Sequence, residues 1–413
     1  MNRRRFAATT AWLSPLSSAL AWQATQTADQ KRPPKSLILL WLNGAPSQLE
    51  TFDPHPDSEI SFGSKAIPTS LPGAQFSENL PHTAEIAENL TIIRSLVSLE
   101  GDHSRAQYYL RNGYRLDPAL VHPSIGAVLC HECPSPHLEI PSHISILPGQ
   151  FPGRGGYLGA LFDAYKITNL KNPLQDMRSP VNDHRDQRRE KGLSVVENAF
   201  HSGRLADLES QRTQHHSLYR AARRMMSSEQ LAAFQLDEEP ASLKAAYGNT
   251  PFGLGCLVAR RLVEAGVRCV EVSLGGWDTH VNNHELQGAR CAILDPAFAT
   301  LVTDLKDRDL LDSTMVFCGG EFGRTPKLNG LEGRDHWPHA FSAALAGGGL
   351  KTGQVLGQTD PTGKKQAPDR PISVADLHYT LQSAFGIDPE VELMTTARRP
   401  LALSQGKPIR ELL

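Results

Sequence analysis

Residues 36–44 read SLILLWLNG, a short apolar run that ends at Asn43 and Gly44. A continuous apolar run of this length, closed by turn residues, is typical of a strand buried on both faces of a parallel sheet. Five further runs have the same character, at residues 90–96, 142–147, 268–274, 314–318 and 341–346. Helical patterns lie between them, at residues 104–111, 124–130, 252–264, 286–308 and 374–385. Strands that alternate with helices predict an α/β fold: a doubly wound, mostly parallel sheet with helices on both faces.

The segment between the third and fourth expected strands has a different composition. Residues 171–204 are rich in Arg, Asp, Asn and His, contain few apolar residues, and are interpreted as a surface loop. Residues 205–236 predict one long helix with a polar face. We therefore expect a single domain over residues 36–413, with a polar excursion and a long helix at about residues 171–240.

The N-terminus predicts an export signal rather than a part of the fold. Three arginines at positions 3–5 precede Phe6, a mildly apolar stretch follows, and a small-x-small cleavage site ends at Ala21. The order Arg-Arg-x-Phe indicates the twin-arginine route of export. We therefore expect an export signal over residues 1–21, a linker over residues 22–35, and a location in the periplasm or the cell envelope.

Composition excludes two classes of protein. The 413 residues include 42 Lys and Arg against 44 Asp and Glu, so the formal charge of −2 excludes a strongly basic nucleic-acid binder. No uninterrupted apolar run reaches the roughly 18 residues that a membrane-spanning helix needs, so no transmembrane segment is expected. The 16 histidines, several of them close to carboxylates, are the first indication of metal chemistry.

Polar residues collect where three of the predicted strands end or begin. GGWDTH (residues 275–280) follows the fourth strand, GGEFGRTP (319–326) follows the fifth, and GRDHWPH (333–339) precedes the sixth. In open α/β sheets, ligands bind beyond the carboxyl ends of the strands. Mixed sets of Asp, Glu and His suit divalent metal ions. We therefore expect Asp278, His280, Glu321 and His336 to converge in space at one polar site.

The segment GDHSRA (residues 101–106) follows the second strand and opens a helix. One interpretation is that Asp102 or Ser104 is the N-cap of that helix. The other is that Ser104 is a nucleophile at the helix N-terminus, where an anion is favoured, and that Arg105 grips the oxyanion. The sequence leaves both open.

Three common motifs are incomplete. GGGLKT (residues 347–352) lacks the glycine that a phosphate-binding loop needs before its lysine, and no G-x-S-x-G elbow supports an ordinary serine esterase. Cys130 and Cys133 have C-x-x-C spacing without a second pair, so a zinc site is unsupported. We interpret them as free thiols, with a local disulfide as the alternative.

Several segments together resemble a family of exported bacterial proteins, a domain of unknown function common in planctomycetes and grouped with the sulfatases in the alkaline phosphatase superfamily. The resemblance covers residues 36–388 and is carried by LNGAPSQLETFDPHPD (42–57), HSRAQYYLRNG (103–113), GGWDTH (275–280), GEFGRTPKLN (320–329), GRDHWPHA (333–340), GGGLKTGQVLGQTD (347–360) and VADLHYTLQSAFGID (374–388). It implies an alkaline phosphatase- or sulfatase-like sheet that carries divalent metals around a Ser, Thr or formylglycine nucleophile.

The resemblance also implies roles for single residues. Asp278 and His280 correspond to one ligand pair, Glu321 stands in place of a ligand aspartate, and His336 corresponds to a late histidine ligand with Asp335 beside it. Three positions depart from the pattern. Phe322 stands where a histidine ligates, Asn43 stands where the first strand delivers an aspartate, and Gly101 occupies the position of a formylglycine precursor.

From these observations we expect a metal-dependent hydrolase of sulfate or phosphate esters, with polysaccharides as a candidate substrate. The alternatives are a non-catalytic member that binds a glycan or another anion, and a structural protein of the envelope. The expected catalytic residues are His103, Ser104 and Arg105, and the expected metal ligands are Asp278, His280, Glu321, Asp335 and His336. The ion is expected to be Zn, Mn, Ca or Mg. The attacking group is expected to be Ser104 or a water on the metal, without formylglycine.

Overall fold

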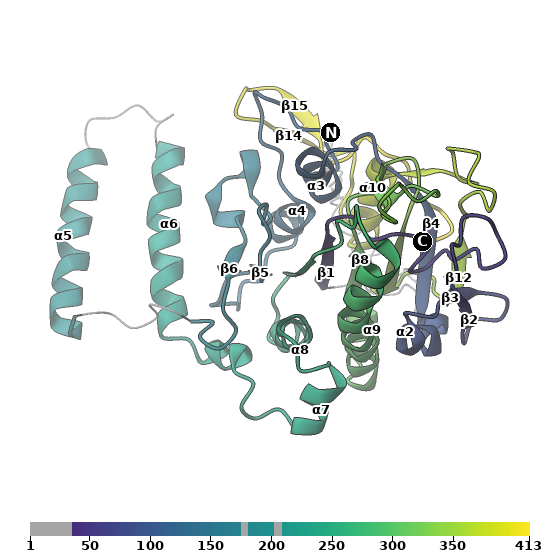
Figure 1. Ribbon diagram of the computed structural model, residues 1–413. Helices are drawn as coiled ribbons and strands as arrows, with labels where there is room; N and C mark the ends of the chain where they lie inside the picture. The colour runs from purple at the N-terminus through teal and green to yellow at the C-terminus, as the bar shows by residue number, and fades with distance from the viewer. Residues whose placement is uncertain (1–34, 175–180, 202–208) are drawn as a thin grey trace, which may run out of the picture. The chain divides into compact units, whose positions relative to one another are not determined.

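The computed structural model describes residues 35–174, 181–201 and 209–413, so the expected export signal lies outside the described residues. A nine-stranded sheet forms the centre, in the order β12-β4-β11-β8-β1-β7-β5-β6, and β13 pairs with β4 (Figure 1). Its strands are β1 (Ser36–Asn43), β4 (Leu90–Val97), β5 (His143–Ile146), β6 (Tyr165–Ile167), β7 (Cys269–Gly275), β8 (Thr314–Gly319), β11 (Phe341–Gly347), β12 (Gln354–Leu356) and β13 (Ile372–Ser373). All six strands predicted from apolar runs are therefore present.

The strands are mostly parallel, as the sequence predicts. β1 lies between β7 and β8 and runs parallel to both. β5 is parallel to its neighbours β6 and β7, and β4 is parallel to β12 and β13. β11 is the exception, because it is antiparallel to both β4 and β8. Antiparallel neighbours need no crossover helix. The chain between β8 and β11 instead forms a small ribbon of β9 (Gly323–Arg324) and β10 (His336–Trp337).

Helices cover both faces of the sheet because the buried side chains of each central strand alternate between two cores. Along β1, Leu37, Leu39 and Trp41 belong to one core, and the residues between them belong to the other. The first core packs against α3 (His103–Asn112), α4 (Ile125–Glu132) and α10 (Val374–Ala384). The second packs against α2 (Pro81–Glu85), α8 (Pro251–Glu264) and α9 (Asn283–Asp307), as Figure 1 shows. The doubly wound sheet is thus confirmed.

The start of α3 decides between the two N-cap candidates. The side chain of Asp102 accepts a hydrogen bond from the backbone N–H of Arg105, so Asp102 is the cap and Ser104 lies inside the first turn. The helix ends at Gly113, which has a φ of 73°. A Cβ there would come within 2.8 Å of the His378 ring, so glycine is required for both backbone and packing.

The middle segment corrects two predictions. Within the region interpreted as a surface loop or excursion, α5 (Asp183–His201) is a helix. The long helix expected over residues 205–236 is instead α6 (Glu209–Met226) followed by a 3-10 helix (Glu229–Phe234), and α7 (Ala241–Ala246) comes after it. Arg, Glu, Gln and Lys form helices well without an apolar stripe, so hydrophobic periodicity does not detect α5. Helices α5 and α6 lie side by side, and Arg223 pairs with Asp186 (Figure 1). Among the described residues, no helix is both long and apolar enough to cross a membrane.

A buried ionic group attaches α3 to the sheet. Glu271 on β7 is 1% exposed, and Arg111 of α3 places Nη1 at 3.1 Å from its Oε2. His143 Nε2 lies 3.3 Å from Oε1, and Ser145 Oγ and the backbone N–H of Gly153 donate to Oε2. Burial alone would raise the pKa of Glu271, but Arg111 and His143 outweigh it and lower that pKa to about 2.

Replacement of Glu271 by glutamine tests this group. Because Arg111 would stay buried without its counter-charge, Glu271→Gln should lower the free energy of unfolding at pH 7 by about 3–5 kcal/mol in urea denaturation. The folded-state pKa lies below the unfolded value of about 4.3, so the stabilisation is present above that value and is lost as the pH falls towards 2. The variant should lack this part of the acid destabilisation. An unfolding free energy equal to that of the exposed control Glu411→Gln would contradict the assignment.

Candidate metal-binding site

The site forms where β1, β7 and β8 end side by side. Asp278 and His280 follow β7, and Glu321 follows β8 directly. The β9–β10 ribbon folds back over this edge and carries His336, and the first turn of α3 brings His103. The carboxyl edge of the sheet therefore gathers residues that lie up to 233 positions apart (336 − 103).

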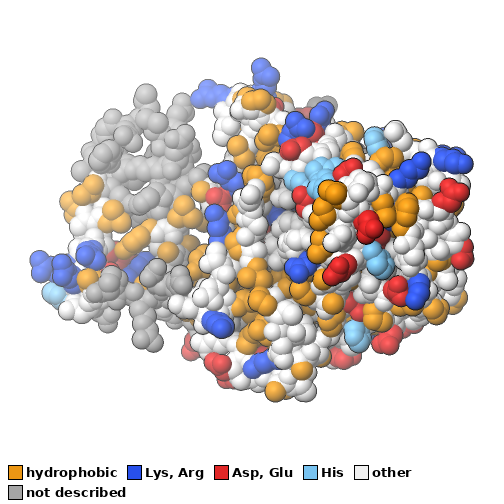
Figure 2. Space-filling model, in the orientation of Figure 1, with side chains coloured by type: hydrophobic (Ala, Val, Ile, Leu, Met, Phe, Trp, Pro, Cys, Tyr) orange, Lys and Arg blue, Asp and Glu red, His pale blue; other side chains and the backbone are white. Residues whose placement is uncertain are grey.

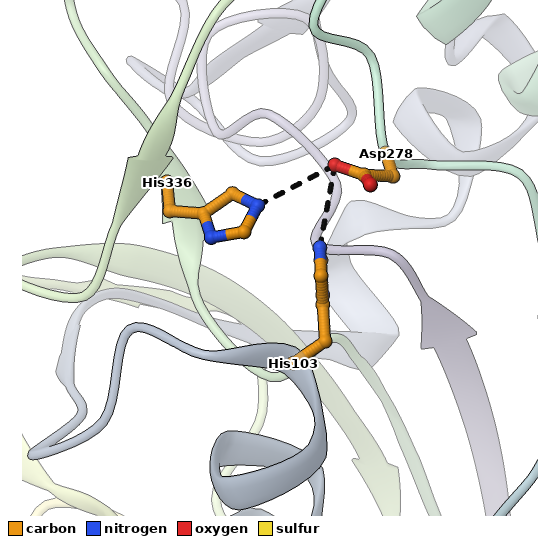
Figure 3. A group of neighbouring side chains, drawn as sticks. All are labelled: His103, Asp278 and His336. Atoms are coloured by element: carbon orange, nitrogen blue, oxygen red, sulfur yellow. Dashed lines mark ion pairs between the residues drawn. The ribbon is translucent and has the colours of Figure 1, made fainter.

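The side chains of His103, Asp278 and His336 point at one another (Figure 3). Asp278 Oδ1 lies 3.3 Å from His103 Nε2 and 3.5 Å from His336 Nε2, and the three donor atoms are all within 4.8 Å of one another. His280 Nε2 lies 3.1 Å from both Asp278 Oδ1 and His336 Nε2. Figure 2 shows histidine side chains gathered at one place on the surface, with acidic side chains beside them. We call His103, Asp278, His280 and His336 the histidine cluster.

The Nδ1 atom of each imidazole in the cluster makes a hydrogen bond to an oxygen outside the cluster. His103 Nδ1 lies 2.7 Å from Glu321 Oε1, and His280 Nδ1 lies 2.8 Å from Asp335 Oδ1. His336 Nδ1 lies 2.8 Å from the carbonyl oxygen of Gly101. Carboxylates and carbonyls accept hydrogen bonds, so each Nδ1 donates its proton to its partner, and Nε2 is the ring nitrogen turned towards the cluster.

The convergence expected from the sequence is confirmed, but the carboxylates occupy two different positions. Glu321 is buried, and its Oε1 also accepts from the Gly44 backbone N–H at 3.0 Å and from Gln107 Nε2 at 3.2 Å. Gln107 lies one helical turn after His103, on the same face of α3. Glu321 and Asp335 thus contact the Nδ1 atoms of the imidazoles, whereas Asp278 contacts their Nε2 atoms.

Arg324 fixes the position of Asp278. Its side chain is fully buried, and Nη2 donates to Asp278 Oδ1 at 2.6 Å. Its N–H groups also donate to the backbone carbonyls of Gly44, Ala45, Trp277 and Arg334. Burial raises the pKa of Asp278, but Arg324 outweighs it and lowers that pKa to about 2, so Asp278 is ionised at neutral pH. Sequence reasoning missed this role, because an arginine in a glycine-rich turn looks the same whether it contacts a ligand or the backbone.

The pKa values of His103 on α3 and His336 on β10 are shifted in opposite directions. Burial lowers the pKa of His336, which keeps its ring neutral at pH 7. Burial also disfavours the charged form of His103, but Glu321 and Asp278 outweigh this and raise the pKa of His103. His103 Nε2 is buried and lies 3.3 Å from Asp278 Oδ1. A cation bound here would meet a ring nitrogen and a carboxylate oxygen together.

Phe322 stands where the family resemblance expects a ligand histidine, and it packs against the cluster instead. Its buried ring lies with its centroid 4.9 Å from that of His103 and 4.7 Å from that of His336. Contacts of this kind restrict the rotation of both imidazoles. Phe322 supports the rings without offering a ligand atom.

Two of the expected catalytic residues lie apart from the cluster. Arg105 places Nε at 3.1 Å from Glu100 Oε2, and its side chain is 57% exposed. Ser104 is exposed, and within the described parts of the chain no hydrogen bond or ion pair joins it to the cluster. One turn further along, Tyr108 shares the helix face of Ser104 and contacts His122. His103 alone of the three belongs to the converging group.

The burial of Arg324 gives a stability test. Arg324→Met would leave the Asp278 carboxylate and several buried carbonyls without a donor, so the free energy of unfolding should fall by at least about 3 kcal/mol. Chemical denaturation would measure this, with the exposed Arg105→Met as the matched control and an expected change within about 0.5 kcal/mol. Equal effects of the two substitutions would contradict the role given to Arg324.

Solved structures with similar folds share little sequence with this chain. The chain superposes on Ps i-CgsB in complex with κ-ι-κ-neocarrahexaose with a TM-score of 0.42 and 11% identity, over 86% of this chain and 73% of that one. For alkaline phosphatase from the Antarctic bacterium TAB5 the values are 0.38 and 12%, over 87% and 100%. For the PsFucS1 sulfatase from Pseudoalteromonas sp. they are 0.36 and 12%, over 91% and 72%.

Comparison with curated proteins gives no match. The comparison with family models gives one, over residues 34–413, to the family described as "Protein of unknown function (DUF1501)". The match includes all the described strands and every residue of the histidine cluster. This chain therefore belongs to the DUF1501 family.

Proposed function

We propose that this protein binds one divalent metal ion through His103, Asp278 and His336 and hydrolyses sulfate or phosphate esters. The observation that carries the proposal is the convergence of imidazole Nε2 atoms, each with its Nδ1 held by an acceptor, on the carboxylate of Asp278. Histidines that ligate metals in proteins characteristically donate their other N–H to a carboxylate or a carbonyl. The class of reaction comes from the grouping of the family with sulfatases and alkaline phosphatases.

The donor set favours particular metals. Two imidazoles and one carboxylate suit Zn²⁺ or Mn²⁺, whereas Ca²⁺ and Mg²⁺ prefer oxygen ligands. A bound ion of this kind supplies Lewis acidity to the ester oxygens. Glu321 would orient His103, and Arg324 would hold the Asp278 carboxylate in place.

His280 and Asp335 form a dyad suited to proton transfer. The Nδ1–H of His280 donates to Asp335 Oδ1, so Nε2 is the nitrogen that would accept a proton from an attacking water. The His280 side chain is 43% exposed, so water reaches it. The ionised Asp335 would stabilise the imidazolium that forms. This proposal gives His280 a proton-transfer role in place of the ligand role expected from the sequence.

Water is favoured over Ser104 as the attacking group. Ser104 Oγ has no described hydrogen bond to a base, and a serine hydroxyl is a poor nucleophile without one. His280 Nε2 lies within the cluster itself, 3.1 Å from Asp278 Oδ1. A water between these groups and the ester would be deprotonated directly.

Three alanine variants separate these roles. The wild-type protein should bind about one equivalent of Zn²⁺ or Mn²⁺. His336→Ala should lose both metal and hydrolysis. His280→Ala should keep the metal and lose about 10²–10⁴-fold in hydrolysis, as expected for removal of a general base. Ser104→Ala should remain close to wild type. Elemental analysis of metal-loaded protein and rates with nitrophenyl sulfate and nitrophenyl phosphate measure both properties.

His339→Ala is the control, because His339 is an exposed histidine in the same segment as His336. Metal retained by His336→Ala at the level of this control would place the ion elsewhere. Loss of several orders of magnitude in Ser104→Ala would restore Ser104 as the nucleophile. Metal binding without hydrolysis of either ester would favour a non-catalytic binding protein.

We also propose that the protein acts in the periplasm or the cell envelope after twin-arginine export, which the Arg3-Arg4-x-Phe6 segment supports. Replacement of Arg3 and Arg4 by lysine should leave the precursor in the cytoplasm, because this route requires the arginine pair. Fractionation of the native host, with Arg5→Lys as control, measures the distribution. Normal export of the double variant would refute this route.

A further inference from the structure

A cavity of about 480 Å³ opens beside the histidine cluster. His103 and Asp278 form one wall, and the ends of β1 and β7 with the loop after β5 form the others. Four glycines, at positions 44, 149, 275 and 276, line it. Its size falls within the range of small-ligand sites.

Apart from His103 and Asp278, the lining carries no ionisable side chain. Asn43, Gln107, Gln150 and Ser273 supply uncharged donors and acceptors, and the lining includes neither Lys nor Arg. Asp278 supplies the one carboxylate of the lining. The neighbouring Arg324 is fully buried and is occupied by Asp278 and backbone carbonyls. An anionic group in this cavity would lie beside the Asp278 carboxylate, and the lining offers no Lys or Arg as its counter-charge.

One hydroxyl in the lining lacks a partner. Ser273 is 7% exposed, and its Oγ has no hydrogen bond among the described residues. A buried hydroxyl without a partner is unfavourable, so the position favours a ligand that supplies a donor or an acceptor. The amide of Asn43 faces the same space, because a Cβ on Gly149 would come within 2.8 Å of its Nδ2.

We infer that this cavity binds an uncharged, polyhydroxylated group, such as a sugar residue, through Asn43, Gln150, Ser273 and exposed glycine backbone. Hydroxyl groups both donate and accept hydrogen bonds, which matches a lining of amides, a hydroxyl and peptide groups. The cavity would hold the alcohol portion of the ester, while its anionic group faces the metal. Only this last orientation rests on the proposed function, and binding of the uncharged group does not.

Gly275 allows the cavity to be filled without disturbance of the fold. It lies two residues after Ser273 on β7, so its added side chain would point to the same face of the strand. A Cβ at this position meets no atom within 4 Å. Gly275→Leu would therefore occupy the cavity. Gly330 also has open space around its Cβ and is not part of the lining, so Gly330→Leu is the matched control.

Ligand-detected NMR on chelator-treated protein tests the inference without any need for activity. The probes are methyl glucoside, methyl glucoside 6-sulfate and methyl glucuronoside, which share one ring and differ in charge. Methyl glucoside should bind at millimolar concentration, and the two anions should bind about tenfold more weakly or worse. Gly275→Leu should abolish binding of methyl glucoside, and Gly330→Leu should leave it unchanged.

Three results would overturn the inference: no binding of methyl glucoside, equal binding of the anionic probes, or unchanged binding in Gly275→Leu. If these occur while metal-loaded protein cleaves nitrophenyl esters, the cavity assignment fails and the proposed function stands. If methyl glucoside binds as expected while no ester is cleaved, the cavity assignment stands and the proposed function fails.

Discussion

The buried guanidinium of Arg324 is the interaction on which the rest of the site depends. Gly44 and Ala45 follow β1, Trp277 follows β7, and Arg324 itself follows β8, so its hydrogen bonds join the ends of three adjacent parallel strands. The same group holds Asp278 Oδ1 at 2.6 Å. Glycine at position 44 lets the chain after β1 pack closely against the chain after β7, since a Cβ on Gly44 would lie 2.6 Å from the backbone nitrogen of Asp278. The position of the carboxylate is thus set by backbone geometry.

Around this fixed carboxylate, the charges are arranged in a way that favours one divalent cation. Three carboxylates (Asp278, Glu321 and Asp335) and one guanidinium (Arg324) surround imidazoles whose Nε2 atoms face inward. The carboxylates exceed the guanidinium by two charges, so one divalent ion would make the group neutral. The cavity beside it adds no further positive charge. In the proposed function, a charge-balanced metal site would lie next to a cavity without Lys or Arg, which suits an ester whose alcohol portion carries hydroxyl groups.

Much of this structure could be predicted from the sequence, because a strand buried on both faces of the sheet has a continuous run of apolar residues. The runs that became β1, β4, β5, β7, β8 and β11 are continuous and apolar, and their ends identified the residues that converge. The antiparallel direction of β11 could not be predicted, since a buried strand reads the same in either direction. Helix α5 has no apolar stripe and so gives no periodic signal.

The different roles of the carboxylates within the site could not be predicted from the sequence. Glu321 and Asp278 both follow strands, yet one lies behind His103 and the other faces its Nε2. That distinction depends on which ring nitrogen each carboxylate meets, and sequence spacing carries no information on it. The role of Phe322 as a support for two imidazoles depends in the same way on packing across α3, β8 and β10.

The central claim is that the Nε2 atoms of His103 and His336 carry the lone pairs that bind a metal. Nitrogen-15 NMR of the imidazoles at mildly alkaline pH tests it directly, because it reports which ring nitrogen is protonated. The account predicts protonated Nδ1 in His103, His280 and His336 of metal-free protein. On addition of Zn²⁺, the Nε2 resonances of His103 and His336 should shift, while Nε2 of His280 should show no bond to the metal. Protonated Nε2 atoms, or spectra unchanged by Zn²⁺, would contradict the account.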